Sequence, residues 1–199
     1  MRIIAGAVRG RHLSAPNYPG LRPISARIKK SLFDILKGVL PGCKLLDLFA
    51  GSGAVGLEAL SRGADFVFFV EKNKSCRDAI TVNLEKSGLA ARAKVWPGNA
   101  LEDLSWIPFR AEVSSFDVIF LGPPYKDEEK KPLAYSSPAL AQVARAGLLS
   151  PLGIVVCQHH IKEEVFVPEE FALVRREKYG DTLLDFLRPK RASTGVVAP

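Results

Sequence analysis

An acidic residue followed by closely spaced glycines is the feature of this sequence best suited to binding a cofactor. Asp47 ends an apolar run, and Gly51, Gly53 and Gly56 follow it. The run predicts a buried parallel strand, and the residues after the glycines predict a helix that reaches Ser61. Gly51 and Gly53 let the backbone turn and approach a ligand because neither has a Cβ. The N–H groups that open the helix point into the same space.

The glycine spacing alone fits two cofactors. Gly51-x-Gly53-x-x-Gly56 matches the dinucleotide fingerprint, and Glu71 follows at the end of the next apolar run, about twenty residues on. The two cofactors are a dinucleotide and S-adenosyl-L-methionine. The carboxylate of Asp47 distinguishes them, because it would repel the pyrophosphate of the first and attract the ammonium group of the second. Glu71 would then accept both ribose hydroxyls. We therefore predict S-adenosyl-L-methionine as cofactor; the alternative is that Asp47 only caps the turn.

Further cofactor-binding residues are expected at the carboxyl ends of the strands, where ligands of open parallel sheets bind. Asn99 follows the third predicted strand, and we expect its amide to bond the exocyclic amine of adenine. The predicted cofactor-binding residues are Asp47, Phe49, Ala50, Gly51, Ser52, Gly53, Glu71, Lys72, Asn99 and Ala100.

A second apolar run, over residues 116–121, leads directly into Gly122-Pro123-Pro124-Tyr125. A proline pair presents a backbone carbonyl rigidly, and an aromatic ring can stack on an extruded base. The stretch resembles the Pro-Pro-aromatic motif of methyltransferases that modify exocyclic amines, and its features suit that chemistry. The lone pair of such an amine is delocalised into the base until acceptors hold its two N–H bonds out of plane. We predict that Gly122, Pro123, Pro124 and Tyr125 form the catalytic site; the alternative is a loop that the prolines merely stiffen.

Strands and helices alternate from Lys44 onward, which predicts an open, mostly parallel sheet of seven strands. Strands are expected up to residue 48 and over 66–71, 93–96, 116–121 and 153–158, with a closing hairpin over 171–179 and 182–187. Helices are expected from the Ser25 N-cap to about 37, and over 54–61, 72–87, 101–104 and 137–146, with a loop near Pro108.

The chain of 199 residues fits one domain with a small extension. Its apolar runs fall short of the roughly 20 residues of a membrane span, and the N-terminus has no secretory pattern. Cys43, Cys76 and Cys157 have no C-x-x-C spacing, and neither they nor His159-His160 predict a metal site. We therefore expect a cytoplasmic protein without a metal.

The net charge of +7 is concentrated before Asp34. That segment has seven basic residues and no acidic one, which leaves 28 − 7 = 21 basic against 21 acidic residues in the rest. Two short strands around Gly6 to Gly10 are expected there as a hairpin, and a helix whose residues Arg27, Lys29 and Lys30 remain available to a ligand. Such asymmetry indicates a nucleic-acid partner, and the alternative is a solvated basic arm. The predicted RNA-binding residues are Arg2, Arg9, Arg11, Arg22 and Arg27.

The whole chain, over about residues 1–188, resembles one family. The chain is similar to the bacterial 16S ribosomal RNA (guanine-N2)-methyltransferases of the small ribosomal subunit (RsmD-like family). The matching stretches are Arg2-Ile3-Ile4-Ala5-Gly6, Arg9-Gly10-Arg11, Arg22-Pro23, Ser31-Leu32-Phe33, Asp47 to Gly53, Val70-Glu71-Lys72-Asn73 and Tyr179-Gly180-Asp181-Thr182, and 123–125 match the Pro-Pro-aromatic part of the amine methyltransferase motif.

The resemblance implies an α/β, Rossmann-like class I S-adenosylmethionine-dependent methyltransferase with an N-terminal β-hairpin and helix that grip RNA. The implied domains are a basic RNA-binding extension over 1–41, a methyltransferase domain over 42–189 and a disordered tail over 190–199. The implied substrate is 16S ribosomal RNA in the small subunit or its assembly intermediate.

Two residues depart from the pattern of this family. Gly122 stands where the family usually has Asp, and Asn99 where it usually has an acid. Gly122 has no side chain to accept the guanine amine, and loss of one preorganised partner typically costs ~10²–10³ in rate. A ribosome-assembly factor that binds RNA without turnover is therefore the second hypothesis. A DNA amine methyltransferase is the third, disfavoured because there is no separate target-recognition domain, and a dehydrogenase is the last.

Overall fold

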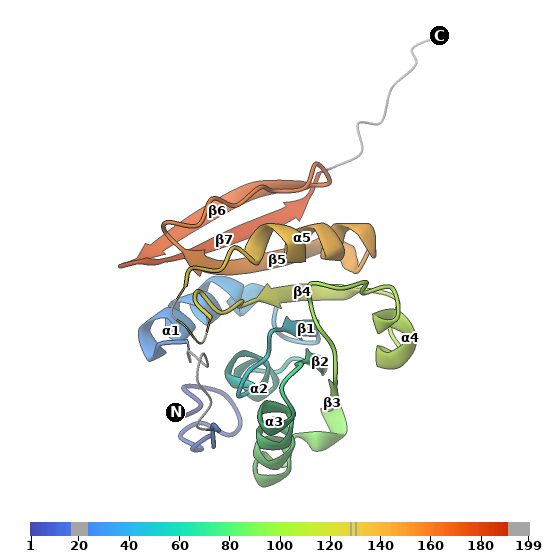
Figure 1. The fold of residues 1–199 in the computed structure, drawn as a ribbon. Helices are drawn as coiled ribbons and strands as arrows, with labels where there is room; N and C mark the ends of the chain where they lie inside the picture. Colours follow the sequence, from blue (N-terminus) through green and yellow to red (C-terminus); the bar gives the residue numbers. More distant parts are fainter. Residues whose placement is uncertain (17–23, 128, 130, 191–199) are drawn as a thin grey trace.

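The computed structural model describes residues 1–16, 24–127, 129 and 131–190, so Arg22 and all of the predicted tail except Lys190 lie outside the described residues. A seven-stranded sheet runs through the molecule in the order β3-β2-β1-β4-β5-β7-β6 (Figure 1). The strands are β1 (Lys44–Leu48), β2 (Phe66–Val70), β3 (Ala93–Trp96), β4 (Phe116–Leu121), β5 (Leu149–His160), β6 (Phe171–Tyr179) and β7 (Thr182–Pro189). The first five are parallel, and β7 and β6 close the sheet as an antiparallel hairpin.

Helices cover both faces of the sheet (Figure 1). They are α1 (Ala26–Ile35), α2 (Ala54–Ser61), α3 (Lys74–Ser87), α4 (Ile107–Ala111) and α5 (Ser136–Arg145), with short 3-10 turns at Leu36–Gly38 and Ala90–Arg92. Adjacent strand residues point to opposite faces, so Leu45 packs with α1, α2 and α3, whereas Leu46 packs with α4 and α5. The central strands are therefore apolar on both faces, as predicted.

Pairing register brings the ends of three strands to one edge. Leu48 lies opposite Val70 on β2 and opposite Leu121 on β4. The residues that follow these ends, Phe49 and Glu71 among them, therefore begin at the same height at the carboxyl edge of the sheet.

Two predicted elements are wrong in detail. Residues 101–104 form a turn instead of a helix, because Asn99 holds the amide of Leu101 with its side chain (3.1 Å) and accepts from Glu102 N with its carbonyl (3.0 Å). The helix begins at Ile107, and Pro108, expected in a loop, lies in its first turn, where a missing N–H has no cost. The fifth strand also starts earlier than expected, at Leu149.

The N-terminal segment is a turn whose two arms pair in antiparallel fashion around a bridge between Arg2 and His12, with backbone bonds from Ile3 N to Arg11 O and from Leu13 N to Met1 O. The two predicted strands themselves are not formed. Its backbone is held from the side by α2. Glu58 accepts from Ile4 N (2.8 Å) and Ala5 N (3.0 Å), and Ser61 bonds the backbone of residues 5, 7 and 8. The backbone amides of residues 4, 5, 7 and 8 are thus satisfied by this helix and not by a partner strand.

Candidate functional site

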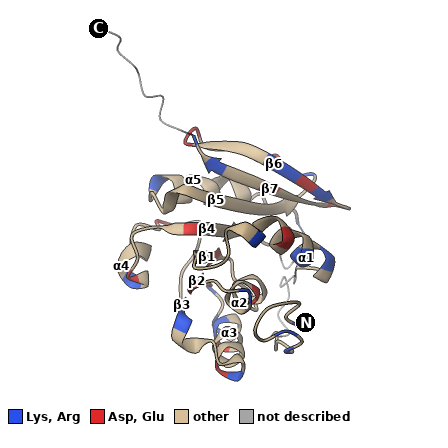
Figure 2. Cartoon of the chain, turned by 180° about the vertical axis from the view of Figure 1, so that it is seen from behind, with Lys and Arg blue, Asp and Glu red and all other residues tan. Residues whose placement is uncertain are grey.

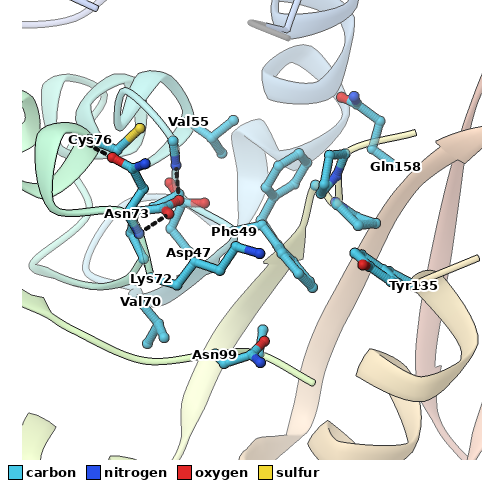
Figure 3. Close-up of a pocket in the computed structure, with 18 of the residues that line it drawn as sticks. Asp47, Phe49, Val55, Val70, Lys72, Asn73, Cys76, Asn99, Tyr135 and Gln158 are labelled. Atoms are coloured by element: carbon cyan, nitrogen blue, oxygen red, sulfur yellow. Dashed lines mark hydrogen bonds between the residues drawn. The ribbon is translucent and has the colours of Figure 1, made fainter. Parts of the chain in front are cut away.

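A cavity of about 240 Å³ opens at the carboxyl edge of the sheet (Figure 3). It brings together all the predicted cofactor-binding residues except Gly53, and all four residues of the predicted catalytic loop. Gly53 instead turns the chain into α2 with φ 76°, and a Cβ there would stand 3.0 Å from Ile80 and 3.1 Å from Leu57. Gly53 therefore does not line the cavity, and its predicted role in the turn is confirmed.

The loop between β1 and α2 follows an unusual backbone path. Phe49 adopts φ 59°, a region that residues other than glycine and asparagine rarely occupy, and Gly51 has φ 56°. Gly56, the third glycine of the motif, lies inside α2, where a Cβ would stand 2.2 Å from the ring of Phe69. The motif thus serves both the turn and the close packing of helix on sheet.

Asp47 is almost fully buried at the base of this loop, and its Oδ2 accepts from Gly56 N at 2.9 Å. Burial raises the pKa of this carboxyl to about 8; the Gly56 N–H opposes the shift, and the nearby Glu71 adds to it. The capping role weighed as an alternative is therefore real, and it coexists with a place in the cavity wall. A cation entering the cavity would favour the ionised form of Asp47.

Glu71 follows β2 and fixes the loop from its other side. Its Oε2 accepts from Gly51 N and its Oε1 from Asn73 N, both at 2.8 Å. Asn73 in turn caps α3 through Cys76 N at 3.1 Å. Each carboxylate oxygen has a further lone pair, so both can also accept from a ligand hydroxyl.

Asn99 lines the opposite wall of the cavity (Figure 3), and its amide is partly engaged. Oδ1 accepts from Leu101 N, and Nδ2 donates to Glu102 at 3.0 Å. One N–H and one lone pair remain for a ligand, which is enough for the predicted contact with a base edge. Lys72 extends its exposed side chain along the same wall (Figure 3).

Tyr125 is only 8% exposed, so it does not offer an open stacking surface. Its hydroxyl donates to Thr182 (3.4 Å) and accepts from Gln158 Nε2 (3.0 Å), while its ring meets His160 edge-on at 5.7 Å between centroids. Sequence reasoning missed Tyr135, whose partly exposed ring lines the cavity, and Phe120, which also lines it but is only 5% exposed.

The missed residues come from segments that carry no motif. Tyr135 precedes α5, and Gln158 lies near the end of a strand with no neighbouring signal except His159. His159 itself is buried, with Nε2 at 3.1 Å from Asp185, and does not line the cavity. Only the alignment of β4 with β5 brings Gln158 to the predicted catalytic loop.

The four predicted RNA-binding arginines within the described residues, Arg2, Arg9, Arg11 and Arg27, are exposed. Figure 2 shows basic positions in the N-terminal segment and in α1. Arg2, Arg9 and Arg27 line a second, open depression, which shares Ile24 with the cofactor cavity.

Lys29, expected to be available, is instead buried. Its Nζ lies 2.9 Å from Glu58 Oε2 and donates to Arg2 O. The prediction that Lys29 is available to a ligand is wrong because the apolar positions of α1 carry it into the protein. Its charge is neutralised inside the protein.

One side chain of α3 links the N-terminal segment to the cofactor loop. Asn83 Oδ1 accepts from Ser14 N and its Nδ2 donates to Ser14 O, both at 2.8 Å. The same Nδ2 lies 3.4 Å from Ser52 O. The two predicted binding regions are thus joined through a buried amide.

Within the described ranges, no three His, Cys, Asp or Glu side chains cluster as a metal site would require. None of the described helices is long and apolar enough to cross a membrane. Cys43, Cys76 and Cys157 are free thiols, and burial raises the pKa of each.

Sheet order, terminal hairpin and cavity together define the Rossmann-like class I S-adenosylmethionine-dependent methyltransferases. A structure from Escherichia coli, yhhF, whose name classes it with the methyltransferases, superposes with a TM-score of 0.78 at 29% identity and covers 96% of this chain and 98% of its own. The structure of SMU.776, described as a methyltransferase complexed with SAH, shares the fold at 15% identity, with a TM-score of 0.65 over 84% of this chain and 50% of that one.

The chain belongs to the family described as Conserved hypothetical protein 95, whose model matches residues 1–188. It is 32% identical to the Ribosomal RNA small subunit methyltransferase D of Haemophilus influenzae, over 90% of this chain and 89% of the relative. It is 34% identical to YlbH of Bacillus subtilis, over 92% of this chain and 95% of that relative. The predicted family, the enzyme class and S-adenosyl-L-methionine as the cofactor of that class are confirmed.

Proposed function

We propose that this protein transfers a methyl group from S-adenosyl-L-methionine to the exocyclic N2 amine of a guanine in 16S ribosomal RNA, on an assembling 30S subunit in the cytoplasm. One observation carries the proposal. The buried carboxyls of Asp47 and Glu71 and the Pro123-Pro124-Tyr125 loop line the same cavity. A cofactor held by the first pair would present its methyl group towards a base held by the loop.

The cofactor end is shaped for an uncharged sugar and a cationic amino acid. S-adenosyl-L-methionine supplies an electrophilic methyl group on a sulfonium. Asp47 would pair with its ammonium group, and Glu71 with its ribose hydroxyls, while keeping the Gly51 amide bond. Asn99 and Lys72 would flank the adenine from the wall that follows β3 and β2.

The base end would prepare the amine for methyl transfer. The carbonyl of Pro123 would accept one N–H of the amine, which turns its lone pair out of the ring plane. In the transfer, the N–C bond forms as the C–S bond breaks, and the sulfur keeps the electron pair. The methylated nitrogen then loses a proton to solvent, so no strong base is needed.

The substrate class rests on the relatives and on charge. Curated relatives carry the name ribosomal RNA small subunit methyltransferase. The depression beside the cavity is lined by Arg2, Arg9, Arg27 and Lys30, which suits an RNA backbone next to an inserted base. We propose residues 1–41 as the RNA-binding extension and residues 42–189 as the methyltransferase domain.

The test is transfer of labelled methyl groups to small subunits from cells that lack this gene, compared with deproteinised 16S RNA and with subunits from normal cells. We expect labelling of one guanine in the first sample, none in the third, and a weak signal from free RNA. Mapping the label to a base other than guanine, or to large-subunit RNA, would refute the proposed substrate.

Gly122 supports a second candidate, an assembly factor that binds RNA and the cofactor without turnover. The wall at residue 122 has no carboxylate. The same assay separates the candidates, since a binding factor would bind immature subunits and leave them unlabelled.

A further inference from the structure

The end of β5 places a polar side chain beside the acceptor-free position of the catalytic loop. β4 and β5 are parallel, with Leu121 opposite Cys157. The next residues along the two strands are Gly122 and Gln158, and both line the cavity. Gly122 has no side chain. At this level of the cavity wall, the side chain therefore comes from Gln158 on the neighbouring strand, which Figure 3 labels.

The amide of Gln158 has one satisfied and one unsatisfied end. Nε2 donates to the hydroxyl of Tyr125 at 3.0 Å, and that hydroxyl donates onward to Thr182. With Nε2 as the donor to Tyr125, Oε1 is the acceptor end of the amide. Oε1 is shielded from water and has no hydrogen-bond partner within the part of the chain that the structure describes. A buried acceptor without a donor is unfavourable, and a donor that enters the cavity Gln158 lines would remove this cost.

We propose that Gln158 Oε1 is the second acceptor for the substrate's exocyclic amine, acting beside the carbonyl of Pro123. This inference rests on the proposed function, and it names the residue that compensates for the bare backbone at Gly122. Gln158 lines the cavity and the torsion next to a terminal amide is soft, so Oε1 can turn towards a donor there when the amide rotates away from Tyr125. With both N–H bonds held, the nitrogen lone pair faces the methyl group.

An amide acceptor has a chemical consequence that a carboxylate would not have. It carries no charge and does not titrate, so the acceptor adds no acidic limb to the pH dependence of transfer. It also requires a donor on the base, which guanine N2 provides. Inosine lacks that amine and should leave Oε1 without a partner.

The first experiment observes the side chain directly. The chain has two glutamines, Gln142 and Gln158, so protein labelled with ¹⁵N-glutamine gives two side-chain amide signals. Gln142 is an internal control, because its Oε1 is also buried without a described partner, yet it lies on α5 and outside the cavity. Guanosine 5′-monophosphate and inosine 5′-monophosphate are added at saturation in the presence of S-adenosylhomocysteine.

We expect guanosine monophosphate to shift the Gln158 signal, inosine monophosphate to shift it much less, and Gln142 to stay unchanged. Equal shifts with both nucleotides, or no shift of Gln158 with either, would overturn the inference.

The second experiment is kinetic and uses small subunits from the gene-deleted cells. Gln158→Met keeps the side-chain size and removes the acceptor, so we expect kcat to fall about tenfold, the worth of one good hydrogen bond, with little change in the KM for the methyl donor. Gln142→Met is the matched control and should behave as wild type. Gln158→Glu should restore transfer with a new acidic limb in its pH profile, which a merely structural role would not produce.

The two proposals fail in different ways. A guanosine-specific shift of Gln158 in a protein that transfers no methyl group would refute the enzymatic proposal and support this one. Full transfer to guanine by Gln158→Met would refute this one alone.

Discussion

The ring of Phe120 lies where a side chain of residue 122 would begin. A Cβ built on Gly122 would stand 2.8 Å from Phe120 Cε1, closer than real Cβ atoms approach another heavy atom. Phe120 precedes Gly122 by two positions, so both face the same side of β4, and Phe120 is 5% exposed. The large side chain at 120 therefore occupies the space that a side chain at 122 would need.

We expect a carboxylate at 122 to raise methyl transfer only when Phe120 gives way. Gly122→Asp with Phe120→Leu should increase transfer to small-subunit RNA by about tenfold to a thousandfold, the typical worth of one preorganised partner. Gly122→Asp alone should gain less, because its Cβ must displace a packed ring. The measurement is kcat with labelled methyl donor.

Two variants test the cause of that gain. Gly122→Ala with Phe120→Leu stiffens the loop without an acceptor and should not raise transfer. The rise in transfer caused by Gly122→Asp should also be larger when Gln158 is changed to Met. In that background the new carboxylate replaces the missing Gln158 acceptor instead of duplicating it. Equal gains with and without Gln158 would contradict this replacement.

Asp47→Asn should weaken the cofactor and stabilise the free protein. The variant loses the charge that attracts the ammonium group, yet its carbonyl can still accept from Gly56 N. Calorimetry with S-adenosylhomocysteine should show at least a tenfold loss of affinity at pH 8. Asp117→Asn is the control, since Asp117 holds Lys44 N and Ser150 at the opposite end of the sheet. A similar loss in that control would show a general effect on the fold.

The pH dependence follows from the raised pKa of Asp47, about 8 against an ordinary 3.8. Between these values the unfolded chain has released the proton and the folded chain retains it, so this group lowers stability as pH rises through that window. The advantage of Asp47→Asn in melting temperature should therefore grow from pH 5 to pH 8 and then level off. The affinity of the wild-type protein for S-adenosylhomocysteine should rise as the pH approaches 8, because the Asp47 carboxyl ionises there.

The buried pair of Lys29 and Glu58 should dominate the attachment of the N-terminal segment. Burial would raise the pKa of Glu58, but the Ile4 amide, Arg62 and Lys29 outweigh it and hold the pKa below its ordinary value. Glu58→Gln leaves Lys29 buried without its counterion and should cost roughly 3–5 kcal/mol in urea unfolding. The stabilising effect of Glu58 is present above the ordinary glutamate pKa and is lost as pH falls through the lowered one.

An exposed ion pair provides the comparison. Lys74 and Asp78 lie 2.7 Å apart, with side chains 78% and 60% exposed, so Asp78→Asn should change stability by less than about 1 kcal/mol. Lys29→Met combined with Glu58→Gln should recover much of the loss. If Glu58→Gln costs no more than Asp78→Asn, the pair does not anchor the segment.

The exposed arginines of the N-terminal segment should set the salt dependence of RNA binding. Changing Arg9 and Arg11 to Ala should reduce the slope of log affinity against log salt by about 0.7 to 0.9 for each phosphate that is no longer neutralised. Changing Arg145 and Lys178 to Ala removes the same charge from exposed positions on α5 and β6. The slope should fall in the Arg9 and Arg11 variant and stay near the wild-type value in the Arg145 and Lys178 variant. Equal slopes would show that the segment contributes only net charge and no phosphate contacts.

Residues that act through local chemistry were predictable from the sequence. The turn at Gly51 and Gly53 is required by backbone conformation, and the central strands are defined by short apolar runs. The helix at 101–104 was wrong because Asn99 captures the amide that a helix would use. Lys29 was expected to be available to a ligand but is buried, because the sequence does not show that it pairs with Glu58.

The residues that complete the cavity depend on pairing between distant segments. Gln158 becomes relevant only when β5 aligns with β4, and Tyr135 only when the loop before α5 folds over the same edge. Phe120 appeared to be one more core residue, and its relation to Gly122 became visible only as a distance. Such residues carry no motif, because their function arises from packing.

Asn83 holds Ser14 on one side and reaches Ser52 on the other, while Gly6 lies so close to Ser61 that a Cβ would overlap the helix backbone. The N-terminal segment is consequently not a portable module. An arm transplanted from a relative would seat correctly only if its partners on α2 and α3 were transplanted with it. Substitutions that preserve the fold are therefore expected at the outward-facing positions of this segment, while the residues that contact α2 and α3 remain constrained.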